Sequence, residues 1–223
     1  MNMSYFVKRA LVKPDITAAF DAPCWAEAGV LPIDRICDEG SGFNPEVNFK
    51  LMYDDEGLYG LFEVKDKYVR CAHTEFQSSV CCDSCLEFFV RPSAGVGYQN
   101  FEINASGTML CMHISDPTRT ESGFKEYRFL TAEEVKDVKI FHTLPDKVEP
   151  EQVGDRTYRL GWFIPFSLFK HLNGAPVPTA GTVWRANVYK CGDCTSHPHW
   201  QSSTPLRAVN YHVPDEFGKI VFG

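Results

Sequence analysis

The chain has 223 residues and a formal net charge of −7, with hydrophobic and charged residues making up 44% and 23% of it. This balance is typical of a globular protein, argues against disorder and leaves no basic stripe for a nucleic-acid backbone. No apolar run approaches the roughly 18 residues that a membrane-spanning helix needs. Neither a nucleic acid nor a membrane is therefore expected as a partner, and the oligomeric state stays open.

Strand patterns dominate the chain. Short runs rich in β-branched and aromatic residues, bounded by Gly, Pro, Asp or Ser, predict ten strands. Turn residues at 53–57 and 104–107 predict two hairpins. In chain order the strands cover residues 5–12, 48–53, 58–64, 84–90, 97–104, 108–114, 138–144, 157–164, 183–190 and 219–222.

Helical patterns are few and short. We expect helices at 23–29 around Trp25, at 131–135 with a capping box of Thr131 and Glu134, and at 167–172. The polar segments 116–125 and 145–156 are predicted as long loops. With no alternation of strand and helix, residues 1–223 are predicted to form a single all-β domain. This domain is an antiparallel β-sandwich of the jelly-roll or immunoglobulin type, with a few short helices.

The cysteines and the start of the chain bear on location. Nine cysteines are an odd number, and Met1-Asn2-Met3-Ser4-Tyr5-Phe6 lacks the basic start and apolar stretch of a signal peptide. The thiols are therefore expected to be reduced, and the sequence as read predicts a cytoplasmic protein. An extracellular or periplasmic location applies instead if the chain is the trimmed form of an exported protein.

One face of the predicted sheet has an unusual composition. Alternate side chains of a strand share a face, so Leu86, Phe88 and Val90 form an apolar row opposite a mixed one. Amides, carboxylates and guanidinium groups beside rings suit sugar hydroxyls, which both donate and accept hydrogen bonds, while the apolar face of a sugar stacks on an aromatic ring. A solvated outer face with ion pairs is the alternative. The mixed faces of three strands together hold Cys85, Glu87, Phe89, Asn100, Glu102, Asn104, Arg185, Asn187 and Tyr189.

With these residues in place, the chain resembles the family 9 carbohydrate-binding modules, within the wider group of DOMON-like sandwiches. The similarity runs from Ala19 to the C-terminus and depends on the order and spacing of many short elements. They are Trp25, Tyr53-Asp54-Asp55 with Leu58-Tyr59, Val64 with Asp66, Asp83-Ser84 with Glu87 and Phe89, Tyr98, Phe101-Glu102-Ile103-Asn104, Ile164-Pro165-Phe166, Trp184-Arg185 with Asn187, Trp200, and Phe217-Gly218.

The resemblance implies a non-catalytic module that binds an oligo- or polysaccharide. In the family this is typically the reducing end of a glucan or xylan, held between two tryptophans. Glu87 matches a sugar-binding carboxylate and Trp200 one stacking ring. The second tryptophan would lie near Cys81, where this chain has Val80-Cys81-Cys82, and Phe76 or His199 are candidates to replace it. The predicted sugar-binding set is Trp200, Glu87, Glu102, Asn100, Arg185 and Asn187.

No cofactor is required for this function, although the family implies structural calcium. Asp54, Asp55 and Asp66 are candidate calcium ligands because calcium prefers oxygen donors, with plain turns as the alternative. Zinc is a second candidate metal, because a Cys-x-x-Cys turn followed by imidazoles suits tetrahedral coordination. Its candidate ligands are Cys191, Cys194, His197 and His199, or a four-cysteine set in which Cys82 and Cys85 join Cys191 and Cys194.

Two alternative functions stay open at this point. Glu87 and Glu102 are a candidate carboxylate pair for a glycoside-processing enzyme, with ion pairing to Arg185 as the plainer explanation. Haem is the other alternative, because some DOMON-like sandwiches carry it on Met, His or Lys ligands. Its candidate ligands are Met109, Met112 and His113. The residues favour binding without catalysis.

Overall fold

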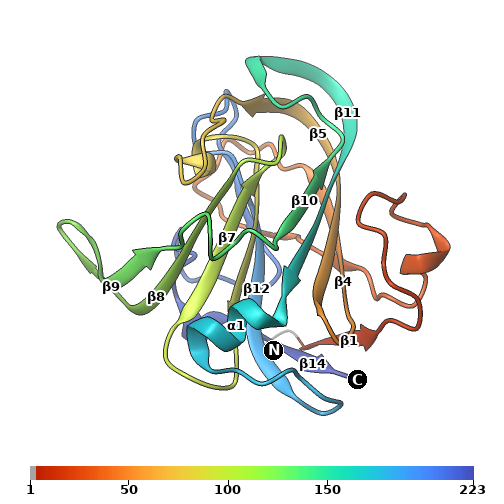
Figure 1. The fold of residues 1–223 in the computed structure, drawn as a ribbon. Helices are drawn as coiled ribbons and strands as arrows, with labels where there is room; N and C mark the ends of the chain where they lie inside the picture. The colour runs from red at the N-terminus through yellow and green to blue at the C-terminus, as the bar shows by residue number, and fades with distance from the viewer. Residues whose placement is uncertain (1–3) are drawn as a thin grey trace.

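The computed structural model describes residues 4–223, so Met1–Met3, part of the start considered for a signal peptide, lie outside it. Two β-sheets pack face to face, with β7, β8 and β9 on one side and β4, β5, β10 and β11 on the other (Figure 1). Strand β1 (Ser4–Arg9) pairs with β14 through its first residues and with β4 through Lys8 and Arg9, so it joins both sheets. The predicted β-sandwich is confirmed.

The first sheet contains, in spatial order, β14 (Gly218–Phe222), β12 (Val183–Cys191), β6 (Cys85–Arg91), β7 (Tyr98–Asn104), β8 (Met109–Thr120) and β9 (Gly123–Phe129). Strand β13 (Trp200–Ser202) extends it from β12 and pairs with β3 (Arg35–Ile36). The second sheet contains β10 (Lys139–His142), β11 (Val148–Pro165), β5 (Gly57–Cys71), β4 (Glu46–Tyr53) and β2 (Leu31–Pro32). Pairing is antiparallel except that β1 runs parallel to both β14 and β4.

Helices are short and lie between strands. They are the 3-10 turns η1 (Pro23–Trp25), η2 (Val80–Cys82) and η3 (Pro214–Glu216), and α1 (Phe166–Asn173). Helix α1 ends at Gly174, whose left-handed φ of 68° is the conformation expected of a C-terminal glycine. Among the described residues, no helix has the length and apolar character needed to span a bilayer.

All ten predicted strands are present, but three other predictions fail. Residues 116–125 are not a loop, because they form the β8–β9 hairpin, and 145–156 are mostly the curved first half of β11. Both segments are polar, yet their backbone groups pair with a neighbouring strand. Residues 131–135 form turns rather than a helix, although Thr131 and Glu134 make the hydrogen bonds of a capping box.

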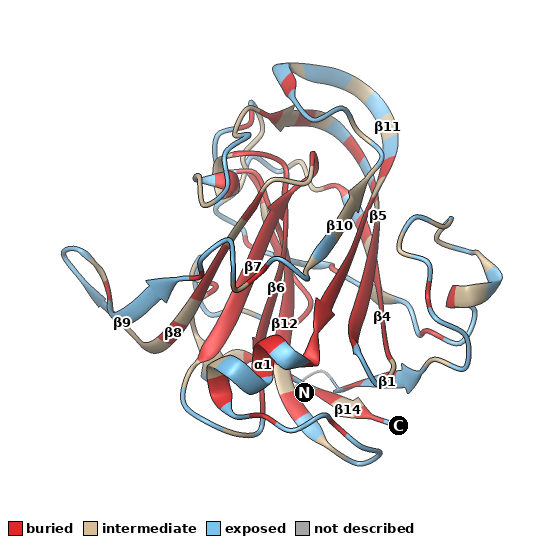
Figure 2. Ribbon diagram, in the orientation of Figure 1, coloured by how far each residue is buried: buried red, intermediate tan, exposed pale blue. Residues whose placement is uncertain are grey.

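The main core fills the space between the sheets (Figure 2). Trp162 of the second sheet packs on Phe88 of the first, with ring centroids 5.0 Å apart, and α1 adds Phe169 against Trp184. Opposite Trp162, Gly60 has no side chain, and the indole ring occupies the space a Cβ would take. The apolar row of Leu86, Phe88 and Val90 belongs to this core, as alternation predicts.

Chain segments cover both outer faces of the sandwich. Residues 10–29 pack Trp25 against the second sheet, and residues 192–217 pack Tyr211 and Phe217 against the first. The mixed face predicted for the first sheet is therefore not a solvated surface, because Glu87 and Glu102 are only 2% and 6% exposed. Its polar groups lie under a protein cover that leaves an opening above Glu87 and Glu102.

Candidate functional site

The opening is a pocket of about 220 Å³ on the outer face of the first sheet. Strands β6, β7 and β12 supply its floor, η2 and the end of β8 supply parts of its wall, and the segment from 193 to 212 completes it. Its lining residues are Cys81, Glu87, Glu102, Arg119, Cys191, Asp193, Trp200, Val209, Asn210, Tyr211 and His212.

Strand register explains why these floor residues meet. Glu87 lies directly opposite Tyr189 on one side and Glu102 on the other, so the three side chains form a row across β12, β6 and β7. In the neighbouring row Cys191 lies between Cys85 and Trp200. Directly opposite residues of antiparallel strands share a face at about 5 Å. The pairing therefore brings a tryptophan and two carboxyl groups to one place.

The two carboxyl groups are buried side by side. Burial raises the pKa of Glu102 to about 7 and holds the pKa of Glu87 well above its ordinary range, with the neighbouring Glu102 adding to the effect. Asn100 Nδ2 donates to Glu102 Oε1 at 2.7 Å, and Cys191 Sγ donates to Glu87 Oε1 at 3.1 Å. At neutral pH the pair can thus retain a proton and offer both a donor and acceptors to a ligand.

Trp200 stands at the rim of the pocket with part of its surface exposed. Its indole Nε1 donates to Asp193 Oδ1 at 2.8 Å, which sets the orientation of the ring. Trp25, Trp162 and Trp184, by contrast, are at most 1% exposed and belong to the cores. Trp200 is therefore the one tryptophan of the described chain whose ring can receive a ligand.

The remaining wall is aromatic and carries one guanidinium. Tyr211 stacks on Tyr189 with centroids 4.0 Å apart, and the Arg119 guanidinium lies 4.1 Å above the ring of Phe124. His212 receives or donates a hydrogen bond at the Tyr98 hydroxyl, 2.9 Å away. Burial and the nearby Arg119 lower the pKa of His212 to about 3, so this ring is neutral at physiological pH.

The six predicted sugar-binding residues divide into three groups. Trp200, Glu87 and Glu102 line the pocket, and Asn100 lies beneath it, holding Glu102. Arg185 and Asn187 lie outside. Arg185 is opposite Arg91 and donates to the Phe217 carbonyl at 3.0 Å, while Asn187 Nδ2 donates to Thr204 Oγ1 at 2.6 Å. Both stabilise the covering segment rather than reach the pocket.

The predicted ring replacements also lie elsewhere. Phe76 is 40% exposed on a different surface, beside Met109 and His142. His199 is fully buried and accepts a hydrogen bond at Nε2 from Lys190 Nζ, 2.7 Å away. Cys81, near which the resemblance places the second tryptophan, does line the pocket.

The zinc ligands predicted from spacing do not converge. His199 is engaged by Lys190, His197 stacks on Tyr68 with centroids 3.6 Å apart, and Cys194 is exposed. The four-cysteine set divides into two pairs: Cys85 faces Cys191 in the sheet, and Cys82, in η2, lies beside Cys194, whose backbone amide donates to the Cys82 carbonyl at 3.1 Å. Within residues 4–223, the one group of three candidate metal-ligating side chains with mutual distances under 4.8 Å is Cys85, Glu87 and Cys191.

The predicted calcium residues do not fit one ion. Asp54 accepts hydrogen bonds from the turn amides of Glu56 and Gly57, and Asp55 pairs with Arg9. Asp66 lies near the other end of β5, roughly 30 Å away at about 3.3 Å per residue. Plain turns explain Asp54 and Asp55.

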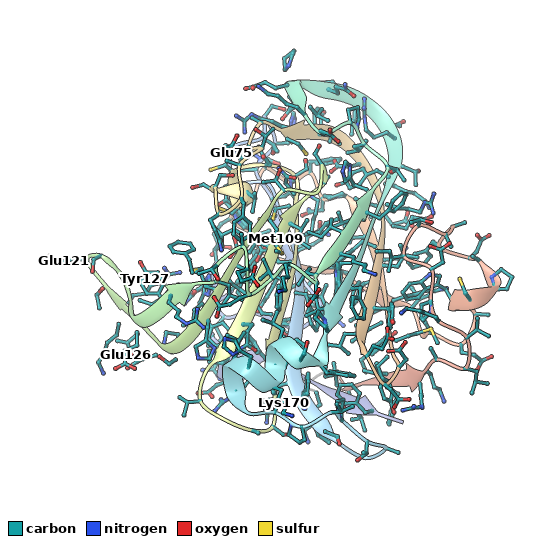
Figure 3. The ribbon with its side chains drawn as sticks, viewed as in Figure 1. Glu75, Met109, Glu121, Glu126, Tyr127 and Lys170 are labelled. Carbon is teal, nitrogen blue, oxygen red and sulfur yellow. The ribbon has the colours of Figure 1, made fainter. Side chains whose placement is uncertain are left out.

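The haem ligands do not converge either. Met109, labelled in Figure 3, packs in the main core, whereas Met112 packs on the opposite face of β8. His113 is held by Gln99 Nε2 at 2.8 Å from its Nδ1. Alternation along β8 puts Met112 on the face opposite Met109 and His113, and those two residues, four positions apart, are roughly 13 Å from each other.

Sequence reasoning missed Arg119, Asp193, Tyr211 and His212 as pocket residues. Arg119 belongs to a segment predicted as a loop, and Tyr211 and His212 lie in a segment without regular structure. Asp193 sits within the Cys191-Gly192-Asp193-Cys194 turn that was interpreted as a metal motif. The aromatic pair Tyr211-His212, next to Val209 and Asn210, is the available signal in this stretch.

Comparison with known proteins agrees with this geometry. A two-sheet sandwich whose pocket brings carboxyl groups to a partly exposed tryptophan is the arrangement expected of a sugar-binding module. The sequence model of carbohydrate-binding family 9 matches residues 24–222, and the chain belongs to this family of non-catalytic modules. No curated protein matches the chain.

Three solved structures are similar. A candidate carbohydrate-binding protein from Bacteroides uniformis shares 26% identity over 100% of both chains, with a TM-score of 0.84. A family 9 module from Caldicellulosiruptor kristjanssonii, solved with glucose, shares 15% identity over 99% of this chain and 96% of that one, with a TM-score of 0.66. Its complex with cellotriose shares 16% identity over 99% and 93%, also with a TM-score of 0.66.

Proposed function

We propose that the pocket on the outer face of the first sheet binds the terminal unit of a glucose- or xylose-based saccharide. Trp200 stacks on the apolar face of the sugar, and Glu87 and Glu102 bind its hydroxyls. Arg119 and Asp193 add a donor and an acceptor at the rim. A volume of about 220 Å³ suits one sugar ring, with the rest of the chain outside.

One observation carries the proposal. Trp200, Glu87 and Glu102 come from three different strands, and all three line the same pocket. The composition of the sheet face indicates the two carboxylates, and the family resemblance indicates Trp200. Burial favours hydrogen bonding there, because a hydrogen bond is stronger in the low local dielectric around the carboxyl pair than in water. The similarity to modules solved with glucose and cellotriose supports the ligand class.

Cys81 limits the expected affinity. Family 9 modules hold the sugar between two tryptophans, and here a small thiol occupies the wall where the second ring belongs. Stacking is therefore expected on one face only. We expect weaker binding than a two-ring module achieves, since each sugar–ring contact contributes about 1 kcal/mol or more.

Calorimetric titration with glucose, cellotriose and xylotriose tests the proposal. We expect binding of at least one, and a loss of about 1 to 3 kcal/mol in Trp200→Ala, which is about 5- to 150-fold in Kd. Phe76→Ala is the matched aromatic control, because Phe76 is exposed on another surface. Arg119→Gln should weaken binding, whereas Arg185→Gln, outside the pocket, should leave it unchanged.

Two results would contradict the proposal. The first is the absence of binding heat for all three sugars at millimolar protein and ligand. The second is an equal loss of sugar affinity in Phe76→Ala and Trp200→Ala, since that would place the ligand elsewhere on the molecule.

A further inference from the structure

Three polar side chains at the floor of the pocket form a compact cluster. Cys85 and Cys191 face each other across β6 and β12, and Glu87 follows Cys85 by two positions on the same face. Their ligand atoms, two sulfurs and a carboxylate oxygen, all lie within 4.8 Å of one another. The exposed fractions are 0%, 2% and 1% for Cys85, Glu87 and Cys191.

The donor atoms of the cluster, two sulfurs and a carboxylate oxygen, suit a soft divalent metal ion. Zinc binds thiolate at about 2.3 Å and carboxylate at about 2.1 Å, which places tetrahedral ligand atoms about 3.5 Å apart. Glu87 Oε1 and Cys191 Sγ are already 3.1 Å apart. Two sulfurs in the set select against calcium and magnesium, which take oxygen ligands.

The surroundings supply an entry path and an open position. Glu87 and Cys191 line the pocket, so an ion can reach them from solvent, whereas Cys85 lies behind them. Three protein ligands leave the fourth tetrahedral position free, and that position faces the pocket. A structural zinc site closes its fourth position with protein, while an open one holds water or a ligand oxygen.

We propose that Cys85, Cys191 and Glu87 bind a zinc-class divalent ion at the floor of the pocket, with its fourth position open to solvent or ligand. Without metal, the cluster satisfies itself through the hydrogen bond from Cys191 to Glu87. Metal binding replaces that bond and releases the two thiol protons, together with the proton that Glu87 carries when protonated. The site does not depend on sugar binding.

Cobalt titration of the reduced, chelator-treated full-length chain tests the site. We expect one equivalent of Co²⁺ with an intense thiolate-to-metal band in the near ultraviolet and the visible bands of tetrahedral coordination, displaced by one equivalent of Zn²⁺. Cys85→Ser and Cys191→Ser should each abolish the band. Glu87→Gln should keep a thiolate band but weaken Co²⁺ binding at least tenfold. Circular dichroism confirms that each variant is folded.

Two other cysteines provide controls. Cys111→Ser, a buried cysteine of β8 outside the cluster, should bind Co²⁺ like the unchanged chain. Loss of the band in Cys194→Ser but not in Cys85→Ser would place the metal on the exposed thiol and overturn the proposal. So would a stoichiometry well below one, or a Cys85–Cys191 disulfide that persists in reductant. A chain that binds Co²⁺ but no sugar would leave this site standing and remove only the proposed function.

Discussion

Asp83 is a buried carboxylate beside the candidate site, and we expect it to stabilise the fold. Its side chain is fully buried and accepts four hydrogen bonds at 2.9 to 3.0 Å, from Arg70 Nη1, the backbone amides of Ala72 and His73, and Asn104 Nδ2. It directly follows η2, which carries Cys81 into the pocket wall. Asp83→Ala therefore leaves four donors without an acceptor.

These contacts set the loss of unfolding free energy that we expect for Asp83→Ala. Removing one partner of a buried ion pair costs about 3 to 5 kcal/mol, because the other charge and its neighbours stay buried. The Arg70 side chain is 23% exposed and can regain some water, so we expect the lower end of that range, about 3 kcal/mol. Asp55→Ala removes an Asp–Arg pair whose side chains are 80% and 45% exposed, and should change the free energy of unfolding much less, because water screens an exposed pair.

Urea unfolding followed by tryptophan fluorescence measures both free energies of unfolding. The reasoning is refuted if Asp83→Ala costs no more than Asp55→Ala while the dependence on urea concentration is unchanged. Asp83→Ala should also lose affinity for the sugar, since η2, next to the pocket, loses the hydrogen bonds of Asp83 that hold its end in place.

Two further changes probe the core and the covering segment. In Gly60→Ala the new Cβ overlaps the Trp162 ring, so we expect a loss of about 1 to 3 kcal/mol in urea unfolding, whereas Gly29→Ala, whose Cβ would lie 3.7 Å from Tyr5, should change little. Equal losses of unfolding free energy in Gly60→Ala and Gly29→Ala would contradict this packing. Burial, with the Lys190 charge, lowers the pKa of His199 to about 3, so between pH 6.5 and 3 the unfolded chain binds a proton that the folded chain does not. The free energy of unfolding should thus fall as pH drops from 6.5, by up to about 1.4 kcal/mol per pH unit from this residue. His199→Gln should flatten that slope between pH 7 and 5; a slope equal to that of the unchanged chain would refute the assignment.

Alternation was the reliable part of the sequence signal. The period of two in β6, β7 and β12 sorts Phe88 from Glu87 and Val188 from Asn187 without any knowledge of what surrounds them. It could not show what lies over the second face. That depends on the long segment 192–217, whose packing of Tyr211 on Tyr189 is a contact between residues far apart in the chain.

The sequence also could not show how far along a strand the pocket lies. Arg185 and Cys191 share a face of β12, yet they are roughly 20 Å apart at about 3.3 Å per residue. Only the Cys191 end opens into the pocket, so a face assignment alone gathered Arg185 and Asn187 with Glu87. Strand register, which needs tertiary structure, decides which part of a face is open.

The spacing of Cys191 and Cys194 does not predict which side chains meet, for a related reason. Cys191 and Cys194 are three residues apart, but the turn between them directs one thiol inward and leaves the other exposed. The sequence partner of Cys191 is thus not its spatial partner. Cys85, more than a hundred positions away, meets it through the β6–β12 register.

Acrylamide quenching of tryptophan fluorescence, with and without sugar, tests the central claim most directly. Trp200 is the one partly exposed tryptophan of the described chain, so it dominates quenching. A saturating sugar that stacks on this ring should lower the quenching constant toward the value of Trp200→Ala, which retains only the buried tryptophans. An unchanged quenching constant, in the presence of a sugar that calorimetry shows to be bound, would contradict binding at this pocket.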